Sequence, residues 1–114
     1  DMNIYDAEEL ADITPEGFIS LNDECRLTNT LSVSGKGEPY DHVMFDPTST
    51  FEIDQTFDMV VIDLVEAMRP FWQEDAPYPG DPYVHNTFKQ YYSDHFPVVF
   101  RLITPPHDDD GLAL

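Results

Sequence analysis

Positive charge is what this sequence has least of. Lys and Arg together number 5 in 114 residues, against 23 Asp and Glu, and the formal net charge is −18. Nucleic-acid binding relies on Lys and Arg side chains at the phosphates, so the composition argues against a free-standing nucleic-acid-binding module. Two interpretations follow: the chain acts on something other than a polymer, or its acidic surface keeps it soluble in a marine or salt-rich host.

Cysteine and long apolar runs are also scarce. Cys25 is the only cysteine, so no disulfide forms within the chain, and one cysteine says little about the redox compartment. No apolar run approaches the roughly 20 residues that a transmembrane helix needs. The length fits one domain, and neither an internal repeat nor a domain boundary is evident.

Local patterns predict three helices. Asp6 with Glu9 three residues later matches a capping box, and Pro15 ends the short apolar stripe that follows. Residues 57–68 carry apolar side chains at helical spacing, although the β-branched residues at 60–62 disfavour a helix. A third helix is expected to start at residues 81–82, where Asp and Pro suit the N-cap and the first helical position.

Short apolar segments outside these helices are expected to be strands. Residues 1–4, 40–45 and 98–103 are the main candidates, residues 51–53 are a shorter one, and residues 18–21 are expected to form a short strand or a turn. Residues 31–38 hold two serines and two glycines, which is typical of an exposed loop. The polar and charged residues 104–114 are expected to form a loose tail.

An acid and an imidazole stand side by side in residues 93–98, which read Ser-Asp-His-Phe-Pro-Val. A carboxylate that holds a divalent cation next to an imidazole that moves a proton suits phosphoester hydrolysis. In a turn that leads into a strand, Asp94 and His95 can face the same cleft. The structural alternatives are a histidine that caps the strand and an aspartate that bonds the backbone of the turn.

Two further motifs contain acids on expected strands. The chain opens Asp-Met-Asn, and on a strand Asp1 and Asn3 would share a face. Residues 39–45 read Pro-Tyr-Asp-His-Val-Met-Phe, which places Asp41 on a strand and the neighbouring His42 on its opposite face. The alternative for Asp41 is a polar residue on an exposed strand face.

Taken in their order along the chain, the three motifs resemble the Gly-Asp-x-Asn, Tyr-Asp-x-Ile and Ser-Asp-His-x-Pro-Val motifs of the endonuclease/exonuclease/phosphatase superfamily, which has the deoxyribonuclease I-like fold. Each short pattern recurs by chance, whereas the ordered set is more specific. The resemblance covers residues 1–103 and implies an α+β domain: half of a four-layer α/β sandwich, with mostly antiparallel sheet flanked by helices.

The resemblance also implies a role for each of five residues. His95 acts at the scissile phosphate as a general base or a proton donor, and Asp41 orients its ring. Asp1 and Asn3 contact the attacking water and the phosphate, which makes Asn3 and His95 the substrate-binding residues. Asp94 binds a hard cation, for which we expect Mg²⁺, with Mn²⁺ or Ca²⁺ as alternatives.

Only the second half of the family's fold is covered by the resemblance. The family's principal metal-binding glutamate lies upstream of these motifs and has no counterpart here. We therefore expect the chain to be a fragment or one of two pieces, whose partner is the missing N-terminal half. A basic groove in that half is a third interpretation of the acidic charge.

These inferences predict part of a metal-dependent phosphodiesterase that uses activated water, and within the family a deoxyribonuclease I-like endonuclease acting on DNA. Other members with the same core cleave sphingomyelin or inositol phosphates, so a lipid or inositol-phosphate phosphoesterase is an alternative. A non-catalytic acidic interaction module, such as a nucleic-acid mimic, is the alternative from a different class.

Overall fold

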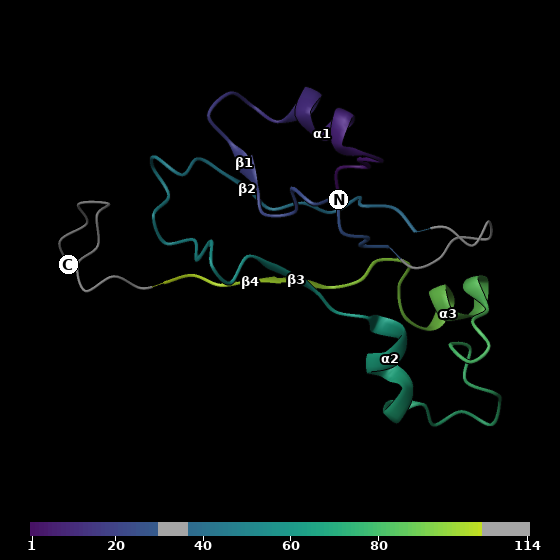
Figure 1. Cartoon of the computed structure of the whole chain (residues 1–114). Coiled ribbons are helices and arrows are strands. Elements are labelled where there is room, and N and C mark those ends of the chain that lie inside the picture. Colours follow the sequence, from purple (N-terminus) through teal and green to yellow (C-terminus); the bar gives the residue numbers. More distant parts are fainter. Residues whose placement is uncertain (30–36, 104–114) are drawn as a thin grey trace.

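The computed structural model describes residues 1–29 and 37–103. These residues form two small antiparallel sheets and three α-helices, so the expected α+β class is confirmed at this level (Figure 1). The half sandwich remains a prediction. The expected loop at residues 31–38 lies mostly outside the described residues, and the expected tail at 104–114 lies wholly outside them. The elements are α1 (Ala7–Ile13), β1 (Ile19–Ser20), β2 (Met44–Phe45), β3 (Met59–Val61), α2 (Leu64–Met68), the 3₁₀-helix η1 (Arg69–Phe71), α3 (His85–Tyr91) and β4 (Val98–Phe100).

The first helix begins as its capping pattern predicts. The Asp6 carboxylate accepts a hydrogen bond of 2.9 Å from the Glu9 N–H, and the Glu9 carboxylate accepts one of 2.9 Å from the Tyr5 N–H. Such bonds satisfy N–H groups that have no partner within the helix. Leu10 is the buried residue of α1, and Pro15 follows the C-cap.

The expected helix at residues 57–68 is wrong in its first half. Residues Met59–Val61 form β3, which pairs antiparallel with β4 so that Val60 lies opposite Val99. The β-branched side chains favour this pleated pairing, and the apolar β4 supplies the partner strand. The helix begins only after Asp63, whose carboxylate accepts hydrogen bonds of 3.0 and 3.3 Å from the Val65 and Glu66 N–H groups.

Three other boundaries differ from the sequence expectation. Residues 1–4 form no strand: Asn3 has a left-handed φ of 50°, and the Met2 N–H donates to the Tyr40 carbonyl at 2.8 Å. The strand expected at 40–45 is reduced to β2, because side chains rather than a neighbouring strand bond the Asp41 backbone. The third helix begins at His85 rather than at residues 81–82.

The remaining short strands follow the predictions more closely. β1 occupies part of residues 18–21 and pairs antiparallel with β2. Residues 51–53 contribute a single bridge from Ile53 to Leu102, which pairs the chain two residues beyond Phe100 with a segment outside β3. The strand expected at 98–103 is therefore β4 with one further paired position.

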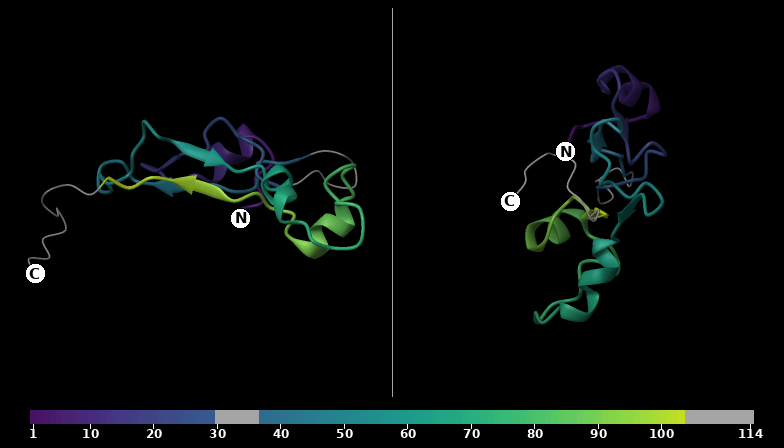
Figure 2. Two further views of the ribbon diagram at one scale, coloured as in Figure 1. Left: turned by 90° about the horizontal axis from the view of Figure 1, so that it is seen from below. Right: turned by 90° about the vertical axis from the view of Figure 1, so that its left-hand side faces the viewer.

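The two sheets share one small core. Leu21, Phe45, Ile53 and Met59 form a buried cluster, against which Val61 and Val98 of β3 and β4 also pack. Helices α2 and α3 lie together at one end of the β3–β4 ribbon, and α1 lies on the side of β1 and β2 (Figures 1 and 2). In the region of α2 and α3, the Phe88 ring is fully buried and lies against the rings of Tyr78, Tyr83 and Tyr92.

One face of the β3–β4 ribbon carries partly exposed aliphatic side chains. Val60 and Val99 lie opposite each other and are 44% and 38% exposed, and Ile62 is 38% exposed. Strands with apolar residues on both faces are typical of sheets that are buried on both sides. No helix in the described ranges is long and apolar enough to cross a membrane.

Candidate active site

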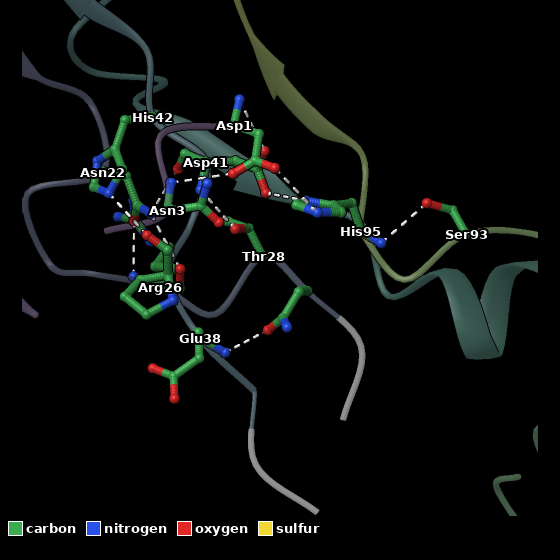
Figure 3. A network of polar contacts seen from close by, with 12 residues as sticks. Asp1, Asn3, Asn22, Arg26, Thr28, Glu38, Asp41, His42, Ser93 and His95 are labelled. Atoms are coloured by element: carbon green, nitrogen blue, oxygen red, sulfur yellow. Dashed lines mark hydrogen bonds and ion pairs between the residues drawn. The ribbon is translucent and has the colours of Figure 1, made fainter. Parts of the chain in front are cut away.

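Asp41 and His95 are in direct contact although they are 54 residues apart in sequence. The His95 Nδ1 and the Asp41 Oδ2 lie 2.8 Å apart (Figure 3), which confirms the predicted contact. His95 lies in the turn before β4, where its N–H donates a 3.0 Å hydrogen bond to the Ser93 hydroxyl. The His95 side chain is 31% exposed and that of Asp41 only 16%, so the carboxylate is shielded and the ring reaches solvent.

The second ring nitrogen of His95 faces Asp1. The Nε2 lies 3.5 Å from the Asp1 Oδ2, and the Asp1 backbone nitrogen lies 3.4 Å from the Asp41 Oδ1. The Asn3 N–H donates a 3.1 Å hydrogen bond to the Asp1 Oδ1. Although the expected strand is absent, the turn at residues 1–3 brings the Asp1 carboxylate to the imidazole, and the Asn3 backbone N–H bonds that carboxylate (Figure 3).

Hydrogen bonding keeps Asp41 ionised. Burial raises the pKa of this carboxyl, but hydrogen bonds from Thr28 and His95 outweigh burial and lower the pKa below its ordinary value. An ionised carboxylate only accepts hydrogen bonds, so the His95 Nδ1 must be the donor. In the neutral ring the Nε2 then carries the lone pair, and it is the nitrogen that faces Asp1.

The Asp94 carboxylate forms an ion pair with a lysine of α3. It is 3.9 Å from the Lys89 Nζ, and the Asp94 side chain is 40% exposed. Within residues 1–29 and 37–103, no group of three or more His, Cys, Asp or Glu side chains is arranged to hold a metal ion. A single exposed carboxylate still suits Mg²⁺, which keeps several waters and uses one or two protein carboxylates together with substrate phosphate.

Thr28 is a residue of the site that sequence reasoning missed. It is fully buried, and its hydroxyl accepts a 2.9 Å hydrogen bond from the Asp41 N–H. Its carbonyl accepts a 2.5 Å hydrogen bond from the Phe96 N–H, and the neighbouring Asn29 forms a β-bridge with His95. A lone threonine in a polar stretch carries no signal of its own, so only the three-dimensional arrangement identifies it.

His42 belongs to a neighbouring network. Its Nδ1 lies 2.8 Å from the Ser20 hydroxyl oxygen, and its Nε2 lies 2.9 Å from the Pro39 carbonyl. Burial lowers the pKa of this imidazole, which favours the neutral ring. These contacts link the residue after Asp41 to β1 and to the chain just before Asp41.

Comparison of the chain with family models, with curated proteins and with solved structures gave no match.

Proposed function

We propose that the chain is part of a Mg²⁺-dependent phosphoesterase that hydrolyses phosphodiester bonds with activated water, most closely a deoxyribonuclease I-like endonuclease acting on DNA. One observation carries the proposal: a solvent-accessible imidazole lies between a shielded carboxylate at Nδ1 and the Asp1 carboxylate at Nε2. A histidine held in this way is poised to take a proton at Nε2 and to be stabilised once it is charged.

Four residues have distinct roles in the proposed reaction. A water molecule held near Asp1 attacks the phosphorus and gives its proton to the His95 Nε2, while the bond from phosphorus to the leaving ester oxygen breaks. That oxygen leaves with a proton from solvent. The Asp41 carboxylate stabilises the imidazolium through Nδ1, and the Asn3 side-chain amide donates to a phosphoryl oxygen without adding negative charge.

Mg²⁺ would stabilise negative charge on the phosphate when bound, and Asp94 is the residue that would hold it in this chain. In Asp94→Ala we expect the Mg²⁺ concentration for half-maximal activity to rise at least about tenfold, because the variant lacks a carboxylate ligand. A tenfold rise corresponds to a loss of about 1.4 kcal/mol in the free energy of Mg²⁺ binding. Plasmid nicking measured over a range of Mg²⁺ concentrations checks this. Asp75→Ala, which removes an exposed acid from the loop before α3, is the matched control. An unchanged Mg²⁺ midpoint in Asp94→Ala contradicts the assignment.

We further propose that the partner is the missing N-terminal half of the same fold. The partly exposed aliphatic face formed by Val60, Ile62 and Val99 supports this, because a sheet with two apolar faces needs a second layer. The same half would supply the further metal ligands.

The chain by itself is therefore expected to be nearly inactive, with an apolar face that binds hydrophobic dye. Nicking assays of the chain alone and in the longer protein, together with dye fluorescence, measure both properties. Strong Mg²⁺-dependent nicking by the purified 114-residue chain would refute the proposed division of the site.

A non-catalytic acidic interaction module is the second candidate, and charge favours it. The cations among the described residues, Arg26, Arg69, Lys89 and Arg101, each form an ion pair with a carboxylate. A module of this kind would bind basic proteins and would do so equally well without His95.

A lipid or inositol-phosphate phosphoesterase uses the same catalytic residues and is distinguished by assaying those substrates beside plasmid DNA.

A further inference from the structure

The backbone of Asp41 is held by side chains. Its N–H donates to the Thr28 hydroxyl at 2.9 Å, and its carbonyl accepts from the Asn22 Nδ2 at 3.2 Å. Strand β2 begins only at Met44, so no sheet ladder fixes Asp41. Thr28 and Asn22 are both fully buried, at 0% exposure. Two buried side chains thus hydrogen-bond the peptide groups before and after the Asp41 Cα (Figure 3).

Thr28 connects both members of the catalytic pair. Its hydroxyl accepts from the Asp41 N–H, while its own N–H donates to the Glu38 carbonyl at 3.0 Å. Its carbonyl accepts from the Phe96 N–H, directly after His95. One residue therefore sets the spacing between the segment that carries the carboxylate and the segment that carries the imidazole.

Asn22 is itself held rigidly. Its Oδ1 accepts from the Arg26 N–H at 2.8 Å, and its Nδ2 donates to the Arg26 carbonyl at 3.1 Å as well as to Asp41. Its backbone N–H donates to the Ser20 hydroxyl at 3.0 Å. With both side-chain amide atoms engaged, the side chain cannot rotate without breaking buried hydrogen bonds, which is costly.

We propose that Thr28 and Asn22 are positioning residues for the Asp41–His95 pair, holding the Asp41 backbone so that its carboxylate meets the His95 Nδ1. This inference rests on the proposed function and extends it to residues that never touch substrate. A shift of about 1 Å in a catalytic group can cost about 10²-fold in rate. The same Thr28 hydroxyl also helps to lower the pKa of Asp41, so its removal is expected to raise that pKa as well as to move the carboxylate.

The decisive comparison is between Thr28→Val and Thr28→Ser. Valine keeps the shape of threonine but loses the hydroxyl, whereas serine keeps the hydroxyl. In Thr28→Val we expect the Asp41 pKa to rise and the ¹⁵N spectrum to show that the His95 ring no longer keeps its proton on Nδ1 alone. In the longer protein, where activity is expected, kcat should fall about 10- to 100-fold with little change in KM. Thr28→Ser should restore all three. If Thr28 had only a structural role, Thr28→Val would leave all three properties unchanged.

Thr14→Val is the matched control. The Thr14 hydroxyl donates to the Leu10 carbonyl at the end of α1, so its loss removes a hydroxyl that does not contact the pair. It should leave the Asp41 pKa and the His95 tautomer unchanged. Asn22→Leu, in contrast, should shift both in the same direction as Thr28→Val.

The inference can also be tested on the unmodified chain, so the test does not depend on whether every variant folds. In the unmodified chain the Asp41 amide should exchange slowly with solvent, and the Thr28 hydroxyl proton should be visible by NMR. Fast exchange of the Asp41 amide, or a folded Thr28→Val protein with an unchanged Asp41 pKa and His95 tautomer, overturns the inference.

The NMR measurements need no turnover, so the two proposals fail separately. If Thr28→Val changes Asp41 and His95 in a protein that hydrolyses no phosphodiester, the positioning contact stands and the proposed function falls. If His95→Ala destroys activity but Thr28→Val changes none of the readouts, only the positioning inference falls.

Discussion

Replacement of His95 by alanine is expected to abolish turnover with little effect on folding. The imidazole is the group that accepts or donates the proton in the proposed reaction, and such groups contribute about 10²- to 10⁴-fold to the rate. The side chain is 31% exposed, so its removal leaves no large internal cavity. Plasmid nicking by the intact protein measures the loss, and circular dichroism verifies the fold.

Two further variants sharpen this experiment. His85→Ala removes an imidazole that lies on α3 and contacts Tyr83 rather than the candidate site, so its nicking rate should match the wild type. Asp41→Asn should give a smaller defect than His95→Ala, because the imidazole remains but loses the charge that orients it. A well-folded His95→Ala protein that cuts at the wild-type rate would show that the catalytic assignment is wrong, and the acidic interaction module would then explain the chain better.

Phe88→Ala is expected to cause the largest loss of stability. The ring is fully buried, and its centroid lies 5.1 Å from that of Tyr92, 5.5 Å from that of Tyr83 and 6.3 Å from that of Tyr78. Truncation of a buried phenylalanine to alanine costs about 3–5 kcal/mol, which is a large share of the stability of a small domain. Denaturant unfolding measures the change in the free energy of unfolding.

Phe71→Ala is the control for Phe88→Ala. Phe71 is 67% exposed, so the same chemical change should alter the free energy of unfolding by only about 0.5 kcal/mol or less. Helix α3 leads directly into the turn that carries His95, so loss of Phe88 should also reduce activity. Equal stabilities for the two variants would mean that the aromatic cluster around Phe88 is not a core.

The contact between Asp41 and His95 could be predicted from the sequence because each residue lies in a recognisable motif. The N-terminus of α1 could be predicted for a similar reason, since a capping pattern is local and Asp6 satisfies it within three residues. These features depend on residues that are adjacent in sequence or on a known order of motifs. Neither kind of signal requires knowledge of which distant segments pack together.

The features that were missed depend on distant segments. Residues 57–68 satisfy helical spacing throughout, yet Met59–Val61 pair with β4 nearly forty residues later. Pairing across that distance outweighs local periodicity. Thr28 and Asn22 were missed for the same reason, because their importance comes from bonds to the Asp41 backbone, which lies 13 and 19 residues away.

The partly exposed aliphatic face of β3 and β4 affects how the protein behaves in solution. An exposed apolar strand pair invites association between copies, and here the net charge of −18 opposes it through mutual repulsion. Acidification toward the sequence pI of about 4.1 removes that repulsion while Val60, Ile62 and Val99 stay exposed. The acidic surface thus acts as a colloidal stabiliser, and buffers near the sequence pI are the conditions in which this chain should precipitate first.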